Sequence, residues 1–137
     1  NLGMIIRSAA AGAIDGIIHS GRGNAALGPL VIKASAGTIY RAPMLQCQSL
    51  RATLQRCQDD GVSICTLEGS ATTSLFEFEP PRHCVFVLGN ESDGVSREIS
   101  ALADTALSIP MHNGVESLNV AIASALVAFS GMLKPSL

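Results

Sequence analysis

The stretch from residue 106 to residue 133 constrains the fold of this chain more than any other part of it. The short apolar run Ala106-Leu107-Ser108-Ile109 predicts a buried strand, and Pro110 ends it because proline has no N–H to continue a ladder. A glycine-containing loop follows, and Ser117-Leu118-Asn119 is predicted to open a long apolar helix that reaches Leu133. A strand end, a loop and a polar helix N-terminus together favour a site for a small polar ligand.

A second strand end of the same kind lies earlier in the chain. The run from His83 to Leu88 is almost continuously apolar, which is typical of a central strand in a parallel sheet. It leads directly into the polar turn Gly89-Asn90-Glu91-Ser92-Asp93-Gly94. Two strand-end loops of this kind indicate one shared pocket.

Helical and extended patterns alternate along the chain. Helices are expected at 1–12 (with Asn1 as N-cap and Gly12 as C-terminal cap), from Pro29 to near Gly37, at 49–57 before Asp60-Gly61, at 96–102 and at 117–133. Strands are expected at 16–20, 62–67, 83–88 and 106–109, with partly extended chain at 38–45 and irregular chain at 68–81. The alternation predicts an α/β domain with a mostly parallel sheet covered by helices on both faces.

Length and composition support one such domain. The chain has 137 residues, of which 47% are hydrophobic and 15% charged, and it has no tryptophan, so its core must consist mainly of Ala, Val, Ile and Leu. The formal net charge of −2 is unlike that of an autonomous nucleic-acid-binding domain. If the substrate is RNA, a local basic patch, a second subunit or a further domain must supply the attraction.

Cysteines and histidines show no metal-binding spacing. The four cysteines form no CxxC pair and are expected to be free thiols in a reducing compartment, the cytoplasm. No signal peptide is visible, and the apolar run 117–133 is too short and too rich in Ser and Asn for a membrane span. The chain also opens on a helix, so we expect that a preceding strand of the fold is missing.

Polar residues cluster at three element ends: Asn1 with Arg7, Asn90 with Glu91, and Glu116 with Ser117 and Asn119. Each cluster alone has an ordinary explanation as a helix cap, a turn or a surface ion pair. A Ser–Glu hydrolase based on Ser117 and Glu116 is one reading, although there is no G-x-S-x-G elbow. No dinucleotide-binding or P-loop motif is present either.

Taken together in this order, the clusters resemble the three motifs of SPOUT-class methyltransferases, specifically the TrmH (SpoU) family of RNA ribose 2′-O-methyltransferases. The matching segments are Asn1 to Ala9, Val87 to Ser96, and Ile109-Pro110-Met111 with Val115 to Ala121, and Lys33 to Gly37 also fits. The resemblance covers essentially the whole chain. It implies a single SPOUT domain over 1–137. We expect the chain to depart from many family members in lacking a separate N-terminal RNA-binding extension.

The resemblance also implies a deep C-terminal trefoil knot and a homodimer. It implies S-adenosylmethionine as cofactor, no metal, and methyl transfer to a ribose 2′-hydroxyl of tRNA or rRNA. The residues implied in cofactor binding are Leu67, Leu88, Gly89, Asn90, Ile109, Met111, Ser117 and Leu118.

The same resemblance implies a catalytic group: Arg7, Asn1, Glu91, Ser117 and Asn119. Arg7 of one subunit is expected to act beside cofactor held by the other. Because a guanidinium is a poor base, we expect Arg7 to bind phosphate or to stabilise the developing alkoxide. Weak candidates for RNA contact are Arg22, Lys33 and Arg41. The alternative to an active enzyme is a catalytically idle module that binds cofactor or RNA within a larger protein.

Overall fold

The structure is a computed structural model that describes residues 1–21, 33–34, 36–37 and 43–133. These residues belong to two compact units. The first unit comprises Asn1–Leu50 and Val120–Leu137, and the second comprises Arg51–Asn119. Each unit is described by itself.

The first unit combines two helices with a pair of parallel strands. Its elements are α1 (Leu2–Ala11), β1 (Ile17–Ser20), β2 (Met44–Cys47) and α5 (Val120–Ser130). β1 and β2 pair in parallel, with Ile17 opposite Met44 and Ser20 opposite Cys47. Parallel pairing requires a long crossover connection, which agrees with the separation of these strands in the sequence.

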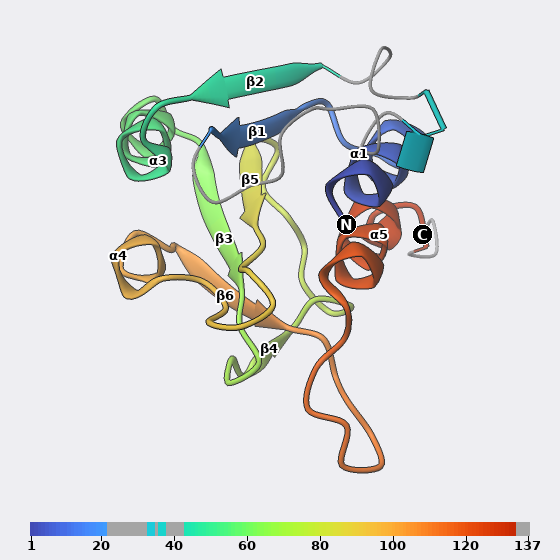
Figure 1. The fold of residues 1–137 in the computed structure, drawn as a ribbon. Helices are drawn as coiled ribbons and strands as arrows, with labels where there is room; N and C mark the ends of the chain where they lie inside the picture. Colours follow the sequence, from blue (N-terminus) through green and yellow to red (C-terminus); the bar gives the residue numbers. More distant parts are fainter. Residues whose placement is uncertain (22–32, 35, 38–42, 134–137) are drawn as a thin grey trace. The chain divides into compact units, whose positions relative to one another are not determined.

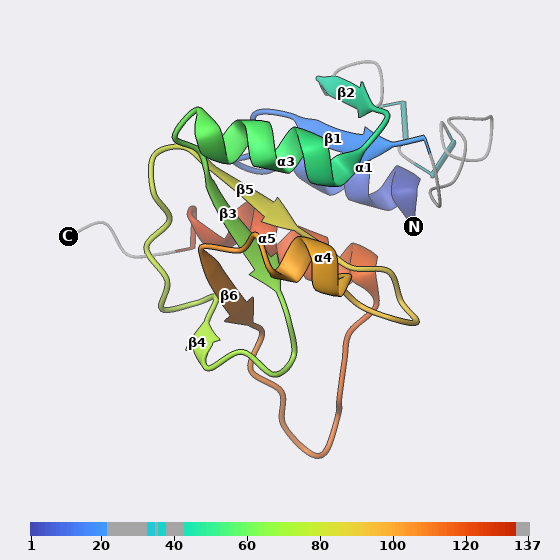
Figure 2. The ribbon, with the colours of Figure 1, turned by 90° about the vertical axis from the view of Figure 1, so that its left-hand side faces the viewer.

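Helices α1 and α5, the first and last of the chain, lie side by side (Figures 1 and 2). On α1 the buried residues are Gly3, Ile6 and Ala9, spaced three apart along one face of the helix. The buried residues of α5 are Ala121, Ser124, Val127 and Ala128, so apart from Ile6 and Val127 the buried side chains of both helices are small. Small side chains on both helices allow their backbones to approach closely.

The second unit is an α/β layer built on a parallel sheet. Its elements are α3 (Leu50–Asp59, of which Leu50 falls in the first unit), β3 (Ser63–Leu67), β4 (Thr73–Ser74), β5 (Cys84–Val87), α4 (Arg97–Ser100) and β6 (Thr105–Ser108). The strand order is β4-β6-β3-β5, and every pairing is parallel. β3 is therefore central, and Ile64, Cys65 and Thr66 on it are almost completely buried.

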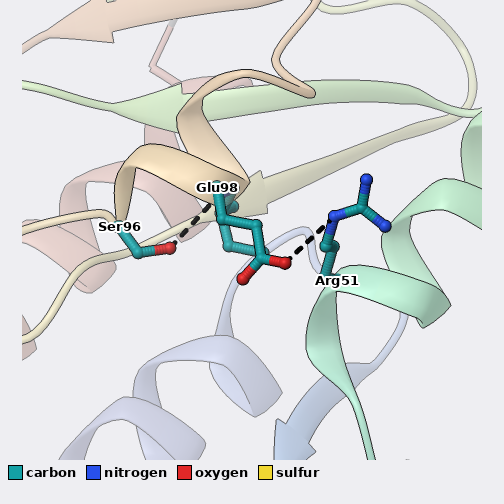
Figure 3. A network of polar contacts seen from close by, with 4 residues as sticks. Arg51, Ser96 and Glu98 are labelled. Atoms are coloured by element: carbon teal, nitrogen blue, oxygen red, sulfur yellow. Dashed lines mark hydrogen bonds and ion pairs between the residues drawn. The ribbon is translucent and has the colours of Figure 1, made fainter.

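Helices α3 and α4 lie in front of this sheet in Figure 2. The buried side chain of α3 is Leu54, and that of α4 is Ile99. The Gln58 side chain of α3 donates a 2.8 Å hydrogen bond to the Leu102 carbonyl just after α4. Arg51 and Glu98 also form a 3.1 Å ion pair between the helices (Figure 3), but both side chains are exposed, so the pair contributes little to stability.

A side-chain cap starts α4, and a carboxylate contact follows the helix. The Ser96 side chain accepts a 3.3 Å hydrogen bond from the Ile99 amide, as a helix N-cap does (Figure 3). After the helix, the Asp104 carboxylate accepts a 2.7 Å hydrogen bond from the Ile64 amide. The Asp104 contact joins the chain after α4 to β3.

Four features differ from the sequence-based expectation. Gly12 is not a left-handed cap, because its φ is −92° and its chain is extended. The segment 68–81 contains β4, which is too short to leave a periodic signal. β5 is an edge strand of the four-stranded sheet described here, not a central one. Helix α5 begins at Val120, not Ser117, since Ser and Asn side chains compete with helical backbone hydrogen bonds.

Other predicted elements are present in the structure or lie partly outside the described residues. The strands predicted at 16–20, 62–67 and 106–109 and the helices predicted at 49–57 and 96–102 are present within two residues. In the segment 38–45, the strand starts only after Pro43, and the part before it lies outside the described residues. Most of the helix expected from Pro29 to Gly37, and the loop after Gly21, also lie outside them. None of the described helices combines the length and apolar character that crossing a bilayer requires.

Candidate functional site

Three predicted ligand-binding residues follow parallel strands of the second unit at the same edge of its sheet. Thr66 of β3 lies opposite Val87 of β5 and Ala106 of β6. Because the strands are parallel, their carboxyl ends lie at one edge of the sheet, where Leu67 ends β3, Leu88 follows β5 and Ile109 follows β6. All three residues are half-buried. Ligands of open parallel sheets bind outside the carboxyl ends of the strands. This edge is therefore the candidate site.

The turn after β5 is compact, because its first residues contact Gly94. A β-carbon at Gly89 would be 2.1 Å from the Gly94 carbonyl carbon, so only glycine fits there. The Asn90 side-chain oxygen accepts hydrogen bonds from the amides of Ser92 (3.0 Å) and Asp93 (2.7 Å). The Asn90 carbonyl also accepts a bond from the Gly94 amide. The Asn90 side-chain oxygen therefore stabilises the turn, and these two hydrogen bonds occupy the oxygen that a ligand would otherwise contact.

The loop after β6 is exposed over residues 112–119. It contains a tight turn in which Asn113 and Gly114 have φ values of 57° and 73°, and the Val115 amide bonds to the His112 carbonyl. Ser117 and Leu118 are exposed in this loop, whereas Met111 is half-buried.

The second and third predicted motifs meet at one pair of side chains. The Asn119 amide nitrogen lies 3.5 Å from Glu91 Oε1, a long hydrogen bond between two exposed groups. The two residues come from different loops at the same edge of the sheet. The structure thus brings together two of the predicted catalytic residues.

An open hollow of about 600 Å³ begins beside Leu67. The turn after β3, the turn after β5 and helix α4 line it. Its charged lining residues are Glu68, Asp93 and Arg97. Two carboxylates against one guanidinium make the hollow acidic.

Glu68 is held firmly in this hollow. Its backbone amide donates a 2.8 Å hydrogen bond to the Leu107 carbonyl, which extends the pairing of β3 with β6. Its carboxylate oxygen Oε1 accepts a short hydrogen bond from the Ser100 hydroxyl of α4. Neither residue belongs to a predicted site, although Glu68 directly follows the strand end at Leu67.

The end of β3 carries one polar atom without a partner. The Thr66 hydroxyl is the buried side-chain polar atom for which the described residues supply no hydrogen bond. Beside it, burial above all raises the pKa of the Cys65 thiol to about 11, and the nearby Cys84 and Asp104 raise it further. All four cysteines are free thiols. The described residues contain no group of His, Cys, Asp and Glu able to hold a metal ion.

The remaining predicted site residues belong to the first unit. Asn1 precedes α1, but its side chain makes no capping hydrogen bond. Arg7 projects from the exposed face of α1 and forms no ion pair with another described residue, so its pairing with a surface carboxylate is not seen there. Lys33 is exposed, and Arg22 and Arg41 lie outside the described residues.

A family profile and curated proteins both relate this chain to the SpoU/TrmH methyltransferases. A profile of the SpoU rRNA Methylase family matches residues 1–129. A curated protein of Staphylococcus saprophyticus, provisionally named a TrmH family tRNA/rRNA methyltransferase, is 34% identical over 129 residues. The alignment covers 94% of this chain and 52% of that protein, so the chain spans about half the length of the curated relatives it matches.

Two solved structures share the fold. The SpoU methyltransferase AviRb from Streptomyces viridochromogenes, in complex with the cofactor AdoMet, aligns with a TM-score of 0.84 and 25% identity over 94% of this chain and 53% of that chain. A structure solved to study the 2-OH methylation of C/U34 on tRNA aligns with a TM-score of 0.80 and 25% identity. That alignment covers 92% of this chain and 82% of the other.

Proposed function

The chain belongs to the SpoU rRNA methylase family, and on this premise we propose that it transfers a methyl group from S-adenosylmethionine to a ribose 2′-hydroxyl of tRNA or rRNA. The observation that carries the proposal is the sheet edge where three parallel strands end, with Leu67 as the last residue of β3, Leu88 just after β5 and Ile109 just after β6. The relatives support it, since one solved relative holds AdoMet and another was solved to study 2-OH methylation of tRNA.

The residues at this edge fit such a cofactor. Half-buried Leu67, Leu88 and Ile109 offer apolar contacts for a flat base, and the turns beside them offer backbone hydrogen-bonding groups. The unpartnered Thr66 hydroxyl lies at the same strand end. When bound, S-adenosylmethionine supplies a methyl group on a positively charged sulfur. We assign its binding to these residues together with Gly89, Asn90, Met111, Ser117 and Leu118.

The chain's own polar residues would position the acceptor. Glu91 and Asn119 lie within hydrogen-bonding distance of each other, and such a pair can orient a neighbouring group. Arg7 is exposed with its guanidinium available, so it can bind an RNA phosphate through two hydrogen bonds and stabilise the alkoxide that develops on the ribose. Asn1 and Ser117 complete the proposed catalytic group, and Lys33, Arg22 and Arg41 are proposed RNA contacts.

A second copy of the chain is part of the proposal. Met4 on α1 and Ile122 on α5 are 47% and 49% exposed in the first unit, so apolar side chains on both helices lack cover. We propose a homodimer that covers them and in which Arg7 of one subunit acts beside the cofactor held by the other. The family resemblance adds a C-terminal trefoil knot and a single domain formed by both units. The four free thiols suit a reducing compartment such as the cytoplasm.

Methyl transfer provides the direct test. The protein is incubated with bulk tRNA or rRNA and isotope-labelled S-adenosylmethionine, and digested RNA is searched for 2′-O-methylated nucleosides by mass spectrometry. Arg7→Ala should lower kcat/KM by about a hundredfold or more, because one transition-state contact is lost. Arg7→Lys keeps the charge but not the forked geometry, so substantial activity in it would argue against two-point binding.

The matched control is Arg51→Ala, which removes an exposed arginine that forms a surface ion pair with Glu98. It should leave kcat/KM within about twofold. A stabilising shift of the thermal midpoint by S-adenosylhomocysteine without methylation of any RNA would favour the idle binding module instead. Labelling of Ser117 by an active-serine probe would favour a hydrolase.

A further inference from the structure

Glu68 occupies a special place in the hollow beside Leu67. It is the first residue after β3, it is half-buried, and it lines the hollow together with Ser100 of α4. Its backbone is fixed on both sides: the amide bonds to Leu107, and the carbonyl accepts a 3.1 Å hydrogen bond from Ala71. The carboxylate therefore projects from a rigid turn rather than from a free loop.

Ser100 fixes the side chain as well. Its hydroxyl donates to Glu68 Oε1, while its backbone amide is used separately within α4. Oε2 makes no hydrogen bond with any described residue. A carboxylate with one oxygen held in place and acceptor capacity left on both oxygens is prepared to receive hydrogen bonds from a ligand.

The charge of the hollow indicates which ligand group it receives. Glu68 and Asp93 outweigh Arg97, so a phosphate of RNA would be repelled there. A neutral pair of neighbouring hydroxyls, attached to a molecule that carries positive charge, would be attracted. Carboxylates bind ribose hydroxyls in this way in other nucleotide-binding folds.

We propose that Glu68, positioned by Ser100, binds the ribose 2′- and 3′-hydroxyls of S-adenosylmethionine. The inference rests on the proposed function, since it places that cofactor at the edge formed by Leu67, Leu88 and Ile109. It adds a specificity-determining residue: Glu68 selects a ribonucleoside cofactor over its deoxy analogues. Ser100 is a positioning residue that acts through Glu68.

The test measures binding rather than turnover. Isothermal titration gives the Kd of S-adenosylhomocysteine and of its 2′-deoxy and 3′-deoxy forms for the wild-type protein and for Glu68→Ala and Glu68→Gln. Wild type should bind the ribo form about ten to a hundred times more tightly than either deoxy form, the range of a hydrogen bond to a charged group. Glu68→Ala should bind all three within about threefold of one another.

Ser100→Ala should reduce the ribo-to-deoxy ratio partially, and Ser100→Thr, which keeps the hydroxyl, should restore it. A merely structural role for Ser100 would change all three Kd values together and leave the ratio unchanged. Glu77→Gln is the matched control, because it removes an exposed carboxylate of the same unit outside the hollow. It should keep the wild-type ratio, and thermal unfolding of each variant confirms that it is folded.

The outcomes separate the two proposals. If wild type binds S-adenosylhomocysteine and Glu68→Ala keeps the full discrimination against deoxy forms, the role of Glu68 is wrong and the proposed function stands. If Glu68→Ala loses the discrimination against the deoxy forms but Glu68→Gln keeps the full wild-type discrimination, the negative charge of Glu68 is not required. The charge argument is then overturned. If wild type does not bind S-adenosylhomocysteine at all, both proposals fail together.

Discussion

Gly12 and Ala128 lie so close together that no side chain fits between them. A β-carbon at Gly12 would be 2.6 Å from the Ala128 carbonyl oxygen and 2.8 Å from the Ala128 β-carbon. The amide of Ala13 donates a 2.8 Å hydrogen bond to the same carbonyl. The contact between the end of α1 and helix α5 therefore depends on the absence of a side chain at position 12.

Gly12→Ala should lower the free energy of unfolding by about 1–3 kcal/mol, because the added methyl group meets backbone atoms that cannot rotate away. Urea unfolding followed by circular dichroism measures the change. Gly131→Ala is the control in the same unit, since a β-carbon there meets nothing within 4 Å. It should change the free energy by less than about 0.5 kcal/mol. Equal losses in both variants would contradict the packing argument.

The sequence identifies Gly12 correctly as the end of α1 but assigns it the wrong role. A glycine after a helix is most often a left-handed cap, and a local pattern cannot distinguish that role from close contact with a distant segment. Here φ is −92°, and the partner, Ala128, lies at the other end of the chain. Apolar periodicity predicts each element because it depends on neighbouring residues, whereas this contact depends on tertiary packing.

Asn90→Ala should loosen the turn after β5, because the amides of Ser92 and Asp93 lose their side-chain acceptor. Removal of one net hydrogen bond of about 1 kcal/mol corresponds to roughly fivefold faster hydrogen exchange at these amides. Nuclear magnetic resonance measures exchange at each amide. Asn90→Asp keeps an acceptor oxygen and should stay near the wild-type rates. Unchanged exchange in Asn90→Ala would show that the backbone of the turn holds without the side chain.

The candidate site shows a similar division between local and distant information. The strand-end positions of Leu67, Leu88 and Ile109 follow from apolar runs and turn residues, and the structure places them at one sheet edge. The contact between Glu68 and Ser100 joins residues 32 positions apart and leaves no sequence signal. The sequence pattern predicts the start of α5 three residues too early, because Ser117 and Asn119 are ordinary helix-starting residues. The contact of Asn119 with Glu91 leaves no sequence signal.

Thr66→Val should raise the free energy of unfolding by about 1–2 kcal/mol, since it removes a buried hydroxyl that has no partner among the described residues while keeping nearly the same shape. The thermal midpoint and urea unfolding of the ligand-free protein measure the gain. Thr73→Val, at an exposed position on β4, is the control and should change little. A loss of stability in Thr66→Val would mean that the hydroxyl has a partner after all, such as a bound water.

Cys65 should make the free energy of unfolding depend on pH in the alkaline range. Burial raises the pKa of its thiol from 9.0 to about 11 in the folded chain. Above pH 9 the unfolded chain therefore loses this proton before the folded chain does, so the unfolded state binds fewer protons and the free energy of unfolding falls as pH rises. The contribution is complete below pH 9 and is lost progressively as pH rises toward about 11.

Cys65→Val removes the titrating group and keeps a buried apolar side chain on β3. Urea unfolding under reducing conditions, repeated at several values between about pH 8 and 11, should give a shallower decline for Cys65→Val than for wild type. Cys84, whose pKa burial also raises, should leave a residual slope in that variant. Cys47→Ala, a change on β2 in the other unit, serves as the control and should decline in parallel with wild type. Parallel declines for Cys65→Val and wild type would show that the Cys65 thiol titrates alike in both states.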